Sequence, residues 1–106
     1  MKLKSLINFL NENTCVMVFV NIPLQIWCEK YEDKIGEFTQ HYLSNNPHYE
    51  TVWVSPEAVP IHYLIDRDLY KFFEDKLEIV DMTNIVGMTN TVEGCTPVLV
   101  IECSIK

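Results

Sequence analysis

One stretch of the sequence decides the fold: Pro97-Val98-Leu99-Val100-Ile101-Glu102-Cys103-Ser104-Ile105. Successive side chains of an extended chain point to opposite faces, so alternate residues form one wholly apolar face of Leu99, Ile101, Cys103 and Ile105. The other face is half apolar and consists of Val98, Val100, Glu102 and Ser104. Because proline has no N–H for the strand ladder, Pro97 marks the start of the strand. The pattern predicts an internal strand whose neighbours come from earlier in the chain.

Hydrophobic periodicity and breaker residues predict the elements before this strand. In chain order they are a helix over 2–12, a strand over 15–21, a helix over 28–44, a strand over 48–54, a short helix over 67–74 and a strand over 76–82. The strand over 76–82 can extend toward 88 with a bulge near Asn84 or Gly87. Ser55-Pro56-Glu57 predicts one helical turn, which Pro60 ends.

These elements predict a single α+β domain over residues 1–106. The expected architecture is a four-stranded, largely antiparallel sheet with two or three helices on one face. The last strand is expected to run antiparallel to the strand before it.

The charge balance of the chain is acidic. Fifteen Asp and Glu residues against eight Lys and Arg residues give a formal net charge of −7. Binding of phosphates needs clusters of Lys and Arg, so this balance argues against nucleic acid and anionic membranes as partners. The expected partner is a basic surface of another protein.

Cysteine usage and hydropathy predict a cytoplasmic protein. The four cysteines contain no Cys-x-x-Cys pair: Cys15, Cys28, Cys95 and Cys103. The apolar residues near the start are interrupted before they form the core of a signal peptide, and no run of about 18 apolar residues predicts a membrane span. We therefore expect reduced, mostly buried thiols.

The residues that could carry catalysis or bind a metal have structural explanations. No metal-binding spacing is present among the histidines His41, His48 and His62. Cys28 is surrounded by the negative charge of Glu29, Glu32 and Asp33, which does not stabilise a thiolate. Asp66 and Asp68 fit a cap and a first-turn acid of the helix over 67–74. We expect no catalytic residue, no metal and no cofactor, and therefore no enzyme.

The helix expected over 28–44 carries two candidate surfaces. An apolar seam follows steps of three and four residues and consists of Cys28, Tyr31, Ile35, Phe38 and Tyr42. This seam either packs on the core or pairs with a second copy of the chain. An acidic ridge lies on another face and consists of Glu29, Glu32, Asp33 and Glu37. Since like charges at i and i+4 repel, the fold does not require the acidic ridge, which is either a solvated face or a surface for a basic partner.

The two ends of the chain resemble those of small proteins of bacteriophages and prophages. The resemblance rests on the opening Met-Lys-Leu-Lys-Ser-Leu-Ile-Asn-Phe-Leu, a polar stop, Cys-Val-Met-Val-Phe-Val at 15–20, and the closing Pro-Val-Leu-Val-Ile-Glu at 97–102. It implies a small accessory protein of the size class that includes anti-defence and anti-CRISPR inhibitors. The resemblance assigns no role to any residue.

Two functions are compatible with these patterns. In the first, the protein is a phage-encoded, non-enzymatic inhibitor in the host bacterial cytoplasm, and its acidic ridge occludes a basic surface of a host defence protein. In the second, the protein is a homo-oligomeric structural or accessory protein that assembles through Tyr31, Ile35, Phe38 and Tyr42.

Overall fold

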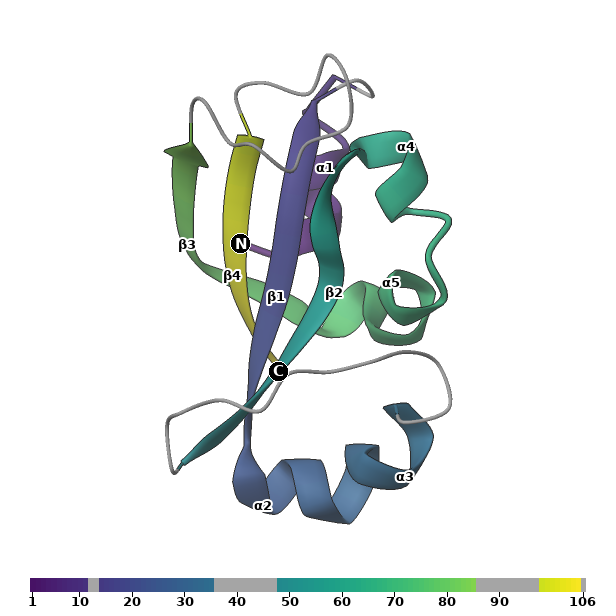
Figure 1. Ribbon diagram of the computed structural model, residues 1–106, viewed down its shortest axis with the longest axis vertical. Coiled ribbons are helices and arrows are strands. Elements are labelled where there is room, and N and C mark those ends of the chain that lie inside the picture. The colour runs from purple at the N-terminus through teal and green to yellow at the C-terminus, as the bar shows by residue number, and fades with distance from the viewer. Residues whose placement is uncertain (12–13, 36–47, 86–97, 106) are drawn as a thin grey trace.

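The computed structural model describes residues 1–11, 14–35, 48–85 and 98–105 (Figure 1). Its elements in chain order are α1 (Leu3–Ile7), β1 (Cys15–Pro23), α2 (Leu24–Ile26), the π-helical turn η1 (Trp27–Tyr31), α3 (Glu32–Ile35), β2 (Tyr49–Pro60), α4 (Ile61–Leu64), α5 (Asp68–Phe73), the 3-10 turn η2 (Glu74–Lys76), β3 (Leu77–Ile85) and β4 (Val98–Ile105). The predicted α+β class is confirmed.

The strands form a mixed sheet. In the described part of the chain their order is β2-β1-β4-β3. The predicted internal position of β4 and its antiparallel pairing with β3 are confirmed. On its other side β4 runs parallel to β1, from the pair Cys15–Val98 to the pair Asn21–Ser104, which the sequence did not predict. A central strand with two neighbours has no exposed edge, which fits the β-branched, apolar sequence of β1.

Strand β2 is longer than predicted because it continues through Pro56. The expected helical turn at 55–57 is wrong, since β2 spans Tyr49–Pro60. Its register with β1 shifts on both sides of the pair Val18–Ser55, so the strand is irregular there. A proline is tolerated at a bulge of an edge strand because no ladder hydrogen bond is lost. The Ser55 hydroxyl donates to the Glu57 carbonyl oxygen at 2.6 Å and closes a local turn.

Three further features differ from the sequence predictions: the length of α1, the presence of α4 and the position of the irregularity in β3. Helix α1 spans Leu3–Ile7 instead of 2–12, and helix α4, at Ile61–Leu64, was not predicted. Helix α5 falls inside the predicted range 67–74. The register of β3 shifts between Ile79 and Asp81, earlier than the bulge expected near Asn84 or Gly87.

The main core lies on one face of the sheet, which we call the helix-covered face. It joins Val16, Val18 and Val20 of β1 with Ile101 and Cys103 of β4, all 0% exposed, and with apolar residues of α1, α4 and α5. The opposite face has a smaller cluster of Cys15, Ala58 and Val98, packed by Met17 and Val100. Since these residues all come from strands, we call it the strand-only face.

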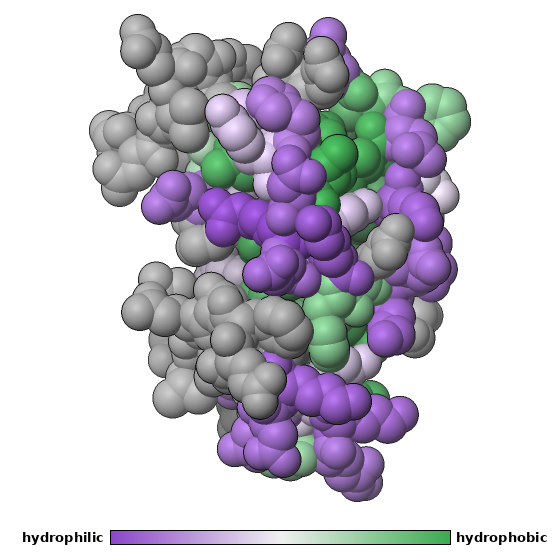
Figure 2. Space-filling view, turned by 90° about the vertical axis from the view of Figure 1, so that its right-hand side faces the viewer, coloured by the Kyte–Doolittle hydropathy of each residue, from purple (hydrophilic) through white to green (hydrophobic). Residues whose placement is uncertain are grey.

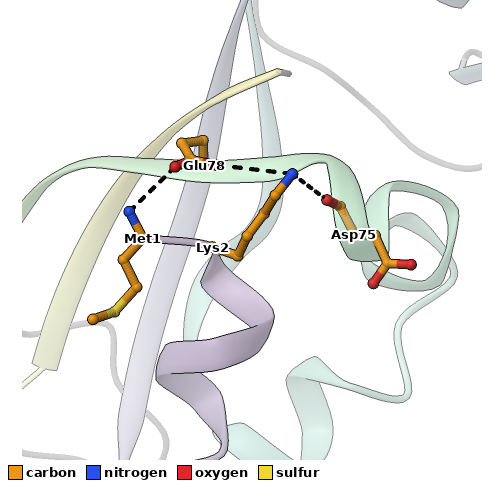
Figure 3. A network of polar contacts seen from close by, with 4 residues as sticks. All are labelled: Met1, Lys2, Asp75 and Glu78. Carbon is orange, nitrogen blue, oxygen red and sulfur yellow. Dashed lines mark hydrogen bonds and ion pairs between the residues drawn. The ribbon is translucent and has the colours of Figure 1, made fainter.

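The first residues of the chain extend the sheet beyond β3. The Ile79 N–H donates to the Met1 carbonyl oxygen at 2.8 Å, and Lys2 forms an antiparallel bridge with Glu78. The Lys2 ammonium donates to the Asp75 carbonyl oxygen at 2.7 Å, and the terminal ammonium of Met1 lies 3.2 Å from the Glu78 carboxylate (Figure 3). Exposed ion pairs of this kind contribute about 0–1 kcal/mol each. The backbone pairing therefore positions α1, and the ion pairs add little.

Candidate protein-interaction surfaces

A helical arm, residues 24–35, follows β1 at the end of the sheet opposite α4 (Figure 1). The Leu24 N–H donates to the His48 carbonyl oxygen at 3.0 Å, which ties the start of the arm to the residue before β2. Trp27 and Tyr31 are only 4% and 7% exposed. The Tyr31 ring lies 5.7 Å from the Phe73 ring and 6.0 Å from the Phe72 ring. Two aromatic anchors therefore hold the arm on the core.

A π-helical turn changes the spacing that the sequence pattern assumed. The Glu32 N–H donates to the Trp27 carbonyl oxygen, an i→i+5 hydrogen bond that spans η1. Such a turn holds more residues than the 3.6 of an α-helix, so steps of three and four no longer keep to one face. Cys28, predicted on the apolar seam, is exposed, whereas Tyr31 is buried. The prediction that both residues share one apolar face is therefore wrong.

The proposed oligomer seam is only partly described. Tyr31 packs on Phe72 and Phe73 of its own chain, so the fold already uses this residue. The backbone of Ile35 ends α3, while Phe38 and Tyr42 lie outside the described residues. Within the described part of the seam, the buried residue therefore contacts its own core.

The acidic ridge is solvent-exposed as far as the structure describes it. Glu29, Glu32 and Asp33 are all exposed, and Glu37 lies outside the described residues. The Glu29 carboxylate accepts a long hydrogen bond, 3.5 Å, from the Gln25 side-chain amide. Among the described residues these three carboxylates form no ion pair. The lower end of the molecule, where the arm lies, is mostly hydrophilic in Figure 2.

Two lysines modify the charge of the same arm. Lys30 and Lys34 are exposed and alternate with the acids, so the described segment 29–34 carries three acids and two bases. On an ideal α-helix, Glu29, Asp33 and Glu37 would stack as an acidic ridge. The structure instead gives this surface mixed charge with an acidic excess.

The strand-only face carries a second group of side chains that sequence reasoning did not select. The Thr51 hydroxyl donates to the Asn21 side-chain oxygen at 2.6 Å, and the Asn21 amide donates to the Glu102 carboxylate at 3.1 Å. The neighbouring rings of Phe19 and Trp53 lie 4.8 Å apart. The three polar residues come from β1, β2 and β4, so only the strand register brings them together. Strand alternation alone could have assigned each residue to a face but not to this contact.

The cysteines differ from the prediction of four reduced thiols. Cys28 and Cys103 are free, but Cys15 is disulfide-bonded. Only the strand register shows that Val98, the strand partner of Cys15, follows Cys95 by three positions. Cys95 itself lies outside the described residues. The sequence prediction failed because it considered only spacing along the chain, and a parallel pair brings distant residues together.

The other candidate residues are not brought into a common site. Asp66 and Asp68 are exposed around the start of α5, and His48 and His62 belong to different segments. Within residues 1–11, 14–35, 48–85 and 98–105, no group of three His, Cys, Asp or Glu residues is placed to hold a metal ion. In the same ranges no helix is long and apolar enough to cross a membrane.

Comparisons with known proteins give no relative. The chain matches no family model, no curated protein and no solved structure. A function must therefore be inferred from the residues of the chain and their arrangement.

Proposed function

We propose that this protein is a non-enzymatic binding protein that covers a basic surface of another protein with Glu29, Glu32 and Asp33, extended by Glu37. The supporting observation is the division of the arm into two sides. Trp27 and Tyr31 are buried, whereas the three described acids are exposed and form no part of the core. The packing of the described core therefore does not use these acids, and binding of a partner would give them a role.

Charge supports the same proposal at long range and at contact. A net charge of −7 attracts a basic partner before contact and raises the association rate. Lys30 and Lys34 stand among the acids and repel a partner whose basic groups are in the wrong places. The attraction of the acids and the repulsion of the lysines together select one orientation of the partner.

The partner that we propose is a host defence protein whose basic surface binds nucleic acid. Carboxylates held at regular positions can occupy the sites that phosphates would take on such a surface. The resemblance of the chain ends to phage and prophage proteins supports a phage-encoded inhibitor. The proposal uses no catalytic residue, metal or cofactor.

A charge-neutralising variant tests the acidic surface. The test variant is Glu29→Gln with Glu32→Gln and Asp33→Asn, and the matched control is Glu57→Gln with Asp66→Asn and Asp68→Asn. Both variants raise the net charge by three and change only exposed acids. The wild-type protein is first used to isolate a partner from bacterial lysate, and association rates are then measured at two ionic strengths. We expect the test variant to associate more slowly and with a weaker salt dependence than the control variant.

Three outcomes would contradict the proposal. Equal association rates and salt dependence for the two variants would place the interface elsewhere. Covalent modification or cleavage of the isolated partner by this protein would show that the protein is an enzyme. Light scattering that shows a stable homo-oligomer, with no partner captured, would favour assembly through the seam of Tyr31, Ile35, Phe38 and Tyr42.

A further inference from the structure

A cleft separates the inner side of the helical arm from α5 and η2. Its volume is about 420 Å³, within the range of about 300–1,000 Å³ that is typical of small-molecule sites. Its described lining consists of six residues: Glu29, Lys30, Tyr31, Lys34, Phe72 and Lys76. Three of the six are lysines, which is unexpected in a chain of net charge −7.

Two lysines of the cleft differ from the lysines near the N-terminus in their ion pairs. Lys2 and Lys4 form ion pairs with Glu78 and Asp75 at 3.8 and 3.1 Å. Among the described residues, by contrast, Lys30 and Lys34 form no ion pair. Among the described residues of the lining Glu29 is the single acid, and it accepts a hydrogen bond from Gln25. The lining therefore has a net positive charge, and an anion in the cleft would reduce the repulsion among the ammonium groups.

The remaining lining is aromatic and oriented by the core. The rings of Tyr31 and Phe72 meet edge to face, with centroids 6.0 Å apart. The Lys76 ammonium lies 5.6 Å from the centroid of the Phe72 ring, a cation–π distance. Tyr31 is 7% exposed, so its ring position is fixed by packing. The cleft thus places flexible cations beside a rigid apolar wall.

We propose that this cleft binds a small organic anion. The carboxylate or phosphate group of the ligand is held by the ammonium groups of Lys30, Lys34 and Lys76, and its apolar or aromatic part lies against Phe72 and Tyr31. Lysine binds such groups as a point charge with several donors, so one site can accept either kind of acid. The cleft shares Glu29, Lys30 and Lys34 with the surface proposed to bind a protein, but anion binding does not require that surface to bind one.

Binding of defined probes to the full chain tests the cleft. Phenyl phosphate, benzoate, inorganic phosphate and benzylamine are titrated at low ionic strength, with amide chemical shifts as the readout. We expect saturable binding of phenyl phosphate and benzoate, weaker binding of inorganic phosphate, and no binding of benzylamine. The first two probes distinguish a phosphate ligand from a carboxylate ligand.

Matched variants locate the binding site. The double variant Lys30→Gln with Lys34→Gln should weaken phenyl phosphate binding by about tenfold or more, the loss expected for two charge-assisted contacts. Lys71→Gln is the control, because Lys71 is exposed on α5 but does not line the cleft. Phe72→Leu should retain inorganic phosphate binding and lose the preference for phenyl phosphate. Circular dichroism checks that each variant remains folded.

The possible failures of this test are distinct from failure of the proposed protein-binding function. Absence of saturable anion binding, binding of benzylamine as tight as that of benzoate, or an equal loss of binding in Lys71→Gln would each overturn the cleft proposal. None of these results changes the association test of Glu29, Glu32 and Asp33, whose readout is a protein complex. The cleft proposal is supported only when anion binding is weakened by substitution of the lining residues and not by Lys71→Gln.

Discussion

The two faces of the sheet are built in opposite ways. On the helix-covered face, Val16, Val18 and Val20 of β1 are all 0% exposed beneath helices. On the strand-only face, the side chains change along the strands from a small apolar cluster to the Phe19–Trp53 ring pair and then to a polar hydrogen-bonded chain. Among the described residues, the helix-covered face thus carries most of the apolar burial, and the strand-only face combines apolar, aromatic and polar side chains.

Thiol reactivity should show the largest difference between buried and exposed positions. Cys103 is 0% exposed on the helix-covered face, whereas Cys28 is exposed on the arm. Only a thiolate reacts, so Cys103 should be labelled by a thiol reagent only when the chain opens. Opening costs up to the global free energy of unfolding, about 5–15 kcal/mol for a domain. Labelling followed by peptide mass mapping, with Cys28→Ser as control, measures the ratio of rates. Native labelling of Cys103 as fast as that of Cys28 would contradict its burial.

The same thiol gives the fold a pH dependence. Burial, with smaller contributions from Glu102 and Glu78, raises the pKa of the Cys103 thiol from 9.0 to about 12. Below pH 9.0 the folded and unfolded states both keep the proton, so this group leaves stability unchanged. Between pH 9.0 and about 12 the unfolded state loses the proton first, and stability falls. Burial also raises the pKa of Tyr31 above 10.0, which acts in the same direction. Denaturant unfolding across this range should show a smaller fall for Cys103→Ala.

Truncation of side chains to alanine on the two faces of β4 should give the next largest difference in stability. Ile101 is 0% exposed on the helix-covered face, whereas Val100 is half-buried on the strand-only face. Ile101→Ala should reduce the free energy of unfolding by about 2–5 kcal/mol, because it leaves a cavity in the main core. Val100→Ala should cost about 1 kcal/mol, the ordinary value for a point change. Denaturant midpoints of the two variants provide the measurement. Equal losses would mean that the strand-only face is packed as tightly as the helix-covered face.

The ring pair on the strand-only face should give the smallest effect. Phe19 and Trp53 lie on paired strands with ring centroids 4.8 Å apart. Aromatic pairs contribute about 0.5–1.5 kcal/mol beyond their area burial. A double-mutant cycle of Phe19→Leu and Trp53→Leu should therefore give a coupling energy in this range. The pair Phe19→Leu and Tyr63→Leu is the control, since Tyr63 belongs to α4, and it should show no coupling. A coupling energy near zero would mean that the contact between the two rings adds no stability beyond the burial of each ring by itself.

Local patterns in the sequence predicted β4, β1, β3 and α5 because each depends on residues close together in the chain. The apolar residues on both faces of β4 predicted its internal position, and its place directly after β3 in the chain predicted their antiparallel pairing. The parallel contact with β1 could not be predicted in this way, since strand direction depends on the path of the intervening chain. The same limit explains why the disulfide at Cys15 and the path of β2 past Pro56 were missed.

The sequence predicted which acids of the arm are exposed, but it did not predict the cleft beside them or the π-helical turn. Glu29, Glu32 and Asp33 were selected from sequence and are exposed. The lysine cleft was missed because Lys76 comes from η2, far along the chain from Lys30 and Lys34. The π-helical turn was also missed, because an α-helical period was assumed across Trp27–Tyr31. Trp27 and Tyr31 in this turn are both buried, and a local sequence pattern does not predict such tertiary packing.

The parallel pairing of β1 with β4 has a consequence for folding during synthesis. Cys15 pairs with Val98, so the central contact of the sheet closes a loop of 83 residues (98 minus 15). Contacts between residues so distant in sequence are entropically costly to form and slow folding. The ribosome must also complete β4 before β1 gains its second neighbour. Until then the edge of β1 that pairs with β4 stays unpaired, and unpaired apolar edges of this kind favour aggregation during folding.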